Sequence, residues 1–128
     1  MLNERDFELY NAAVKARENS YSPYSNFAVG AAVRTADGKI YQGCNIENGS
    51  YGLTVCAERN AIFAAVCAGE RHLAEICVVA DTSGPVSPCG ACRQVMSEFK
   101  INRIILANLK GDVKKMTLKE ILPYGFEL

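Results

Sequence analysis

The alternation of apolar and polar positions predicts a helix followed by a hairpin at the start of the chain. Residues 3 to 18 place Phe7, Tyr10 and Val14 at helical spacing with charged residues elsewhere. The turn-forming stretch YSPYSN then ends this helix. Two apolar runs, FAVGAAVRT and KIYQGCN, flank Asp37-Gly38, a dipeptide typical of tight hairpin turns. The pattern therefore predicts two antiparallel strands after the first helix.

The second half of the chain alternates predicted helices with buried strands. The alanine-rich run AERNAIFAAVCA, which follows Cys56, indicates a helix that is buried on more than one side and ends at Gly69. EICVVAD and RIILANL predict buried strands. Between them we expect a helix with Ser87 as its cap and Pro88 in its first turn, running through Phe99. The capping box TLKE opens a last short helix.

The resulting order is α-β-β-α-β-α-β-α over residues 1–128, with no linker or repeat, which predicts one domain. Strands that are joined through helices run parallel, with right-handed crossovers. We therefore expect an α/β fold with a mixed sheet and helices on both faces. Active sites in such sheets lie at the carboxyl ends of the parallel strands.

Composition narrows the class of partner and the compartment. Fourteen basic and fourteen acidic side chains cancel, so we expect no nucleic-acid or membrane partner and instead a small, roughly neutral one. The N-terminal MLNERDFELY is charged where a secretory signal is apolar, and no run approaches the roughly 18 apolar residues of a membrane span. We therefore expect a cytoplasmic protein. Its six cysteines are then reduced, and Cys67 and Cys77, which lie in apolar runs, are expected in the core.

Three other cysteines are candidate zinc ligands. Cys89 and Cys92 lie three residues apart at a predicted helix start, a spacing that suits tetrahedral zinc with bonds of about 2.3 Å to sulfur. Cys56 begins the other helix that starts at this edge of the sheet, so the three thiols can meet. The two helix N-termini, Arg59 and Arg93 would stabilise the thiolates. Taken alone, Cys-x-x-Cys is equally consistent with a redox pair or two buried residues.

Glu58 is a candidate base beside these thiols. It follows Cys56 by two residues, an offset at which both side chains serve one site only if Cys56 stands at the very start of the helix. Zinc held by three thiolates keeps a position open for water, and such a water needs a nearby base. The alternatives are a solvated Glu58, and a fourth ligand, Cys44, that would close the site and make it structural.

Asn45 and Glu47 are candidates for binding hydroxyl groups. Residues two apart in an extended segment point to the same side, so these two can converge on one ligand with a donor and an acceptor. Turn formation by Asn45 and a solvated Glu47 are the alternatives.

Together these motifs resemble the zinc deaminase signature in its three-cysteine form. Cys56-Ala57-Glu58 and PCGAC carry the resemblance, and YSPYSNF, VGAAV, GCNIEN, SYGLTVCAER, GPVSPCGACRQV and LPYGF extend it to the short, homotetrameric cytidine deaminases. The resemblance covers essentially the whole chain. It implies a three-layer α/β/α cytidine deaminase-like fold with a mixed sheet of about five strands.

The resemblance also implies a reaction and roles for individual residues. The reaction is zinc-dependent hydrolytic deamination of cytidine and 2′-deoxycytidine to uridine and 2′-deoxyuridine with release of ammonia, a step of pyrimidine salvage. Cys56, Cys89 and Cys92 would bind one zinc ion per chain, Glu58 would shuttle protons, and Arg59 would hydrogen-bond the thiolates. The implied substrate contacts are Phe27, Asn45, Glu47, Tyr51, Ala57 and Phe126, the last of them in its own or a neighbouring active site of the homotetramer.

Two other classes of function stay open from the sequence. One is a deaminase of bases within nucleic acid, or of another aminopyrimidine such as blasticidin S. The other is a non-enzymatic zinc module with a closed four-cysteine site, in which Glu58 would have no purpose.

Overall fold

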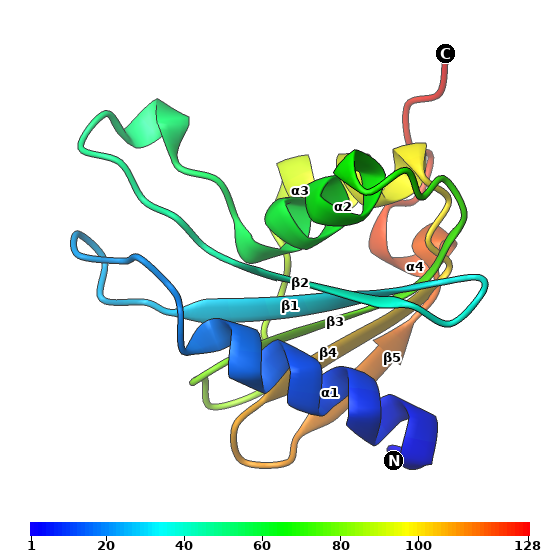
Figure 1. Ribbon diagram of the computed structural model, residues 1–128, viewed down its shortest axis with the longest axis horizontal. Helices are drawn as coiled ribbons and strands as arrows, with labels where there is room; N and C mark the ends of the chain where they lie inside the picture. Colours follow the sequence, from blue (N-terminus) through cyan, green and yellow to red (C-terminus); the bar gives the residue numbers. More distant parts are fainter.

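The computed structural model describes all 128 residues and contains one five-stranded sheet (Figure 1). The helices are α1 (Glu4–Arg17), α2 (Ala57–Cys67), α3 (Gly90–Glu98) and α4 (Leu118–Ile121), with one 3-10 turn, η1 (Tyr51–Leu53). The strands are β1 (Val29–Thr35), β2 (Ile40–Cys44), β3 (Leu73–Ala80), β4 (Arg103–Asn108) and β5 (Val113–Met116).

The strands lie in the order β2-β1-β3-β4-β5, and only the pair β3–β4, which is joined through α3, is parallel. Helix α1 covers one face of the sheet, while α2, α3 and α4 lie on the other (Figure 1). The expected α/β class with a mixed sheet between helical layers is confirmed. The apolar pattern did not indicate β5, because VKKM is a short, polar edge strand. None of the helices combines the length and apolar character needed to cross a membrane.

Two apolar clusters hold the helical layers to the sheet. The larger one, of 18 buried residues, fills the space between the sheet and the layer of α2, α3 and α4. The smaller one, of 7 buried residues, lies between α1 and the sheet. All seven residues of β1 are buried. The centre of the sheet is therefore covered on both faces.

The predicted extent of α1 is confirmed, and of Phe7, Tyr10 and Val14 the last two pack against the smaller apolar cluster as partly buried residues. Phe7 is 51% exposed, whereas Leu9 and Ala13 are fully buried against the sheet. Gly30 in β1 lets the backbone of α1 approach the strand closely, since a Cβ atom there would lie 2.0 Å from the Ala13 carbonyl oxygen. The face of α1 that contains Leu9 and Ala13 is therefore the one that is buried.

Three details of α2 and α3 also differ from the predictions. Helix α3 begins at Gly90 with Cys89, and not Ser87, as its N-cap, and the hydroxyl of Ser87 accepts a hydrogen bond from Arg93 (2.8 Å). Helix α2 is buried on one side only, so Cys67 on its opposite side is exposed, contrary to expectation. Cys77 is buried, as predicted.

Candidate active site

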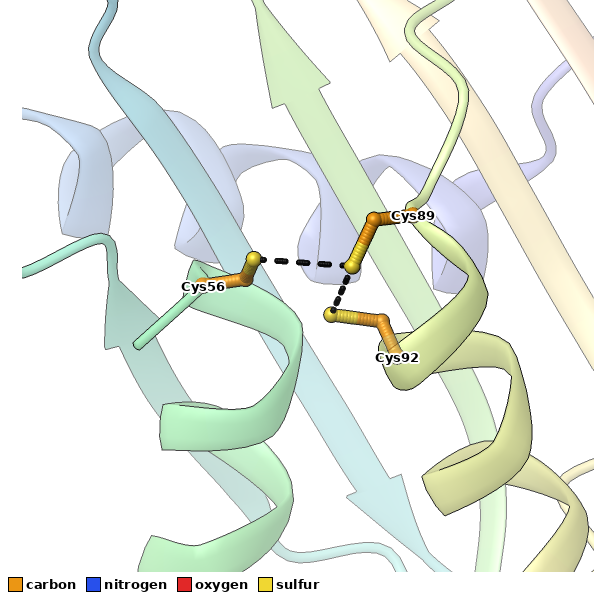
Figure 2. Close-up of side chains that lie close together, drawn as sticks. All are labelled: Cys56, Cys89 and Cys92. Carbon is orange, nitrogen blue, oxygen red and sulfur yellow. Dashed lines mark hydrogen bonds between the residues drawn. The ribbon is translucent and has the colours of Figure 1, made fainter. Parts of the chain in front are cut away.

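The thiols of Cys56, Cys89 and Cys92 converge between the first turns of α2 and α3 (Figure 2). Cys56 is the N-cap of α2 and Cys89 is the N-cap of α3, and both have extended backbones. Cys92 lies in the first turn of α3 and is fully buried. The Sγ atoms of Cys56 and Cys89 are 3.7 Å apart, and those of Cys89 and Cys92 are 3.5 Å apart. The starts of α2 and α3 thus bring together the thiols of Cys56 and Cys89, which are 33 positions apart in the sequence.

This donor set fits a zinc ion. Zinc–sulfur bonds of about 2.3 Å in a tetrahedron separate the sulfurs by about 3.8 Å, close to the distances found here. The ligand atoms of the three cysteines all lie within 4.8 Å of one another. Cys44 does not belong to this group, so the structure offers three thiolates and leaves one tetrahedral position for another ligand.

Positive charge surrounds the three sulfurs. Neither Cys56 nor Cys89 caps its own helix through its side chain, so the amide groups of two helix N-termini face this region unneutralised. Arg59 donates from Nη2 to Cys56 Sγ over 3.4 Å. Hydrogen bonds from Cys92 and then from Arg59 lower the pKa of the Cys56 thiol to about 5. These contacts favour the thiolate of Cys56, the form in which cysteine binds a metal, whereas the hydrogen bond with Cys56 and burial raise the pKa of Cys92.

The expectation that Arg93 also stabilises the thiolates is wrong. Its guanidinium donates to the Pro88 carbonyl (2.9 Å), the Ile121 carbonyl (2.8 Å) and the Ser87 hydroxyl (2.8 Å), and to no sulfur. Arg93 therefore holds the segment that leads into Cys89 against the end of α4.

Glu58 lies in the first turn of α2, beside the cysteines, and is 4% exposed. Its side chain can share a site with Cys56 because Cys56 precedes the helix with an extended backbone (φ −69°, ψ 156°). Burial, reinforced by the negative charge of Cys56, raises the pKa of Glu58 to about 7. A carboxylate with a pKa in this range can both accept and donate a proton near neutral pH. The solvated glutamate that the sequence left open is excluded.

A cavity of about 200 Å³ adjoins Glu58, Cys56 and Cys89. It is lined by Phe27, Val29, Asn45, Thr54, Cys56, Ala57, Glu58, Val86, Ser87 and Cys89. Three of the implied substrate contacts, Phe27, Asn45 and Ala57, are therefore in this lining. Sequence reasoning did not single out Thr54 and Val86, although both lie within the quoted motifs, because only the fold places them at the cavity.

Asn45 anchors the segment before β1 to the end of β2. Its Oδ1 accepts a hydrogen bond from the Val29 amide (2.9 Å), and its Nδ2 donates to the Phe27 carbonyl (2.7 Å). The hydroxyl of Ser20 also donates to Asn45 Oδ1. Asn45 thus lines the cavity and also holds Phe27 at the cavity wall.

Glu47 and Tyr51 lie in a second cavity, of about 400 Å³, that shares Thr54 with the first. Glu47 Oε1 accepts hydrogen bonds from the amides of Tyr24 (2.9 Å) and Ser25 (3.1 Å), and Oε2 accepts from the Ser25 hydroxyl. Like Asn45, Glu47 therefore points toward the segment between α1 and β1. Figure 1 shows this segment and the one between β2 and α2 extending beyond the sheet at the same end.

Phe126 lies outside both cavities of its own chain. Its side chain is 69% exposed, and its carbonyl accepts a hydrogen bond from Gln94 (3.1 Å). The C-terminal tail forms part of a separate shallow hollow with Ser97, Glu98 and Lys100.

Comparisons with known proteins agree with this geometry. Residues 3–108 match the sequence profile of the cytidine and deoxycytidylate deaminase zinc-binding region. The cytidine deaminase of Sporosarcina psychrophila is 56% identical over 114 residues, which cover 88% of this chain and 84% of that protein. The blasticidin-S deaminase of Bacillus cereus is 32% identical and covers 98% of this chain and 94% of that protein.

The fold has a close match among solved structures. The crystal structure of cytidine deaminase from Burkholderia pseudomallei superimposes with a TM-score of 0.92 and 50% sequence identity, covering 98% of this chain and 100% of that chain.

Proposed function

The chain belongs to the cytidine and deoxycytidylate deaminase family, and from that premise we propose that it hydrolyses cytidine and 2′-deoxycytidine to the uracil nucleosides and ammonia. The observation that carries this proposal is a buried carboxylate, Glu58, in one small cavity with Cys56 and Cys89, two members of the cluster of three cysteines. A closed zinc module needs no such acid. The cofactor is zinc, one ion per chain.

Cys56, Cys89 and Cys92 would hold the zinc ion. When bound, zinc supplies Lewis-acid activation of a water molecule at neutral pH. Arg59 would offset the charge of the thiolates, since it donates a hydrogen bond to Cys56 Sγ. Its Nε is buried and has no hydrogen-bond partner within the chain, so this nitrogen remains free to donate a hydrogen bond.

Glu58 would move the protons of the reaction. It accepts the proton of the attacking water as oxygen bonds to C4 of the cytosine ring, and electrons settle on N3. The same carboxyl then donates its proton to N3. It relays the second proton of the water to the 4-amino group, so that the C4–N bond breaks with ammonia as the leaving group. Water is consumed and no redox partner is required.

The walls of the two cavities would orient the nucleoside. Phe27 and Ala57 border the space for the base beside Glu58, and Asn45 and Glu47 offer a donor and an acceptor for ribose hydroxyls. The lining residues of both cavities include no lysine or arginine. A neutral nucleoside therefore fits this lining better than a nucleotide or a nucleic acid does.

Conversion of alternative substrates tests this proposal. The purified zinc-loaded chain is incubated with cytidine, 2′-deoxycytidine, cytosine, single-stranded DNA and blasticidin S, and the loss of the 4-amino group is followed by ultraviolet absorbance. We expect turnover of the two nucleosides only. Faster turnover of blasticidin S than of cytidine would assign the chain to the class of its Bacillus cereus relative instead.

Replacing Glu47 by alanine is expected to raise KM for cytidine and to leave zinc bound, because the loss removes a ribose contact and no metal ligand. Steady-state kinetics together with metal analysis on one sample measure both effects. Asp37→Ala, at the exposed tip of the β1–β2 hairpin, is the control. A KM equal to that of the wild type would mean that the ribose binds elsewhere.

We propose a homotetramer in which Phe126 reaches the active site of a neighbouring subunit. Its exposure and its place in a hollow separate from both cavities support an exchange of this kind. Residues 1–128 would form a single deaminase domain, and a reducing, cytoplasmic location would keep the thiolates available to zinc.

Deleting residues 126–128 is expected to leave zinc content intact and to lower cytidine turnover at low substrate by a factor of about 5 or more, the loss of an aromatic stack worth roughly 1 kcal/mol. Oligomer mass, melting temperature and kinetics are measured on the same sample. If Phe126 only covers its own subunit, the melting temperature falls while KM in the assembled protein does not change.

A further inference from the structure

Gly43 marks a close contact between β2 and the first turns of α2. A Cβ atom added to Gly43 would lie 2.3 Å from the Ala61 amide nitrogen and 2.6 Å from the Ala57 carbonyl oxygen. Both are backbone atoms of α2 and cannot rotate away. Any larger residue at position 43 would therefore displace the helix from the strand.

The part of α2 that Gly43 touches carries the chemistry of the site. Cys56 immediately precedes Ala57, and Glu58 immediately follows it. Asn60, one turn further along, donates from its side-chain amide to the Cys44 carbonyl over 2.8 Å. This bond ties α2 to the residue after Gly43, so the helix cannot relieve a clash by sliding along β2 without breaking it.

The other two cysteines lie on a different helix from the one that Gly43 touches. Cys89 is the N-cap of α3 and Cys92 lies in its first turn, and α3 is connected to β3 and β4 rather than to β2. A shift of α2 away from β2 would therefore move Cys56 relative to its partners. The distance of 3.7 Å between Cys56 Sγ and Cys89 Sγ, which suits a zinc tetrahedron, would change.

We propose that Gly43 is a positioning residue, whose missing side chain sets the distance of the first turn of α2 from the sheet. Through that distance it places the Cys56 thiol against Cys89 and Cys92, and the Glu58 carboxylate in the cavity. The effect on Glu58 rests on the proposed function. The effect on Cys56 rests only on the geometry of the metal ligands.

Gly30 provides a matched control on the other face of the sheet. A Cβ atom there would lie 2.0 Å from the Ala13 carbonyl oxygen and 2.6 Å from the Arg17 amide nitrogen, both in the backbone of α1. Helix α1 carries none of the metal ligands or implied substrate contacts. Gly43→Ala and Gly30→Ala thus introduce the same kind of clash, but only the first one meets the helix of the site.

The test compares the release of zinc from the two variants. Each is loaded with zinc, and transfer of the metal to an excess of a chromogenic chelator is followed with time. We expect Gly43→Ala to release zinc at least about tenfold faster than the wild type, in line with the loss of a residue that orients a metal ligand. Gly30→Ala is expected to have a lower melting temperature and a release rate within about twofold of the wild type.

Turnover per bound zinc is the second measurement. A misplacement of a reacting group by about 1 Å can cost about 100-fold in rate, so we expect kcat of Gly43→Ala to fall by 10-fold or more. KM should change less, because Asn45 and Glu47 lie outside α2. Zinc release needs no substrate, so it tests the proposal even if the wild-type chain does not convert cytidine.

A second variant covers the case in which Gly43→Ala does not fold. Ala31 is opposite Gly43 in the β1–β2 register and belongs to the same buried cluster as Ala57 and Ala61. The double variant Ala31→Gly/Gly43→Ala therefore keeps the number of methyl groups beneath α2 and is expected to fold, yet still to release zinc rapidly. Wild-type release by a folded variant carrying Gly43→Ala would overturn the proposal. Equally fast release by Gly30→Ala, or failure of both Gly43 variants to fold, would also overturn it, since Gly43 would then serve the fold as a whole.

Discussion

Replacing Glu58 by glutamine is expected to reduce the turnover of cytidine by at least about 100-fold, while the fold and the bound zinc are retained. Glutamine has nearly the same size and keeps hydrogen-bonding capacity, but it cannot accept and return a proton. Glu58 is buried beside the cysteines, burial raises its pKa to about 7, and it is the only carboxylate among the residues that line this cavity.

Glu4→Gln is the matched control for this variant. Glu4 also lies in the first turn of a helix, α1, but it is exposed and on the other face of the sheet. Its substitution should leave kcat, KM and zinc content at wild-type values. Near-normal turnover by Glu58→Gln with full zinc occupancy would show that another group moves the protons.

Replacing Cys89 by alanine is expected to abolish zinc binding or to weaken it strongly. The loss should exceed the roughly 10- to 100-fold decrease in affinity that follows removal of a residue that only orients a metal ligand. Only Cys56 and Cys92 would remain of the three cysteines whose sulfurs all lie within 4.8 Å of one another. Metal analysis after dialysis against a weak chelator measures the loss. Cytidine turnover should fall with it.

Cys44→Ala is the control for Cys89→Ala, and it is expected to bind zinc as the wild type does. Cys44 ends β2 and lies outside the cluster of three thiols. Burial raises the pKa of its thiol, which disfavours the thiolate that a metal requires. Loss of zinc from the Cys44 variant would instead support a closed four-cysteine site.

Local patterns in the sequence were sufficient to predict most of the fold. The Asp37-Gly38 turn, the alanine-rich run after Cys56 and the capping box at Thr117 each specify structure through nearby residues, and all three elements formed where expected. Prediction failed where contacts distant in the sequence decide the outcome. The buried face of α1 follows from its close approach to β1, and Cys67 is exposed because α2 is buried on one side only.

The candidate site divides in the same way. The convergence of Cys56, Cys89 and Cys92 could be predicted, because a helix start is a local feature and two such starts share one edge of the sheet. The exclusion of Cys44 from the cluster, the contribution of Thr54 to both cavities and the contact of Gly43 with α2 all depend on packing between separate elements. No spacing rule within the chain encodes them.

The most direct test of the central claim is the dependence of cytidine turnover on zinc in the wild-type chain. Zinc is removed with a chelator, the chelator is dialysed away, and zinc is returned in measured portions while the loss of cytidine absorbance is recorded. The account predicts no turnover without zinc and a rate that rises in proportion to added zinc until one ion per chain is bound. Full turnover by the zinc-free chain, or none by the chain carrying one zinc ion, would contradict it.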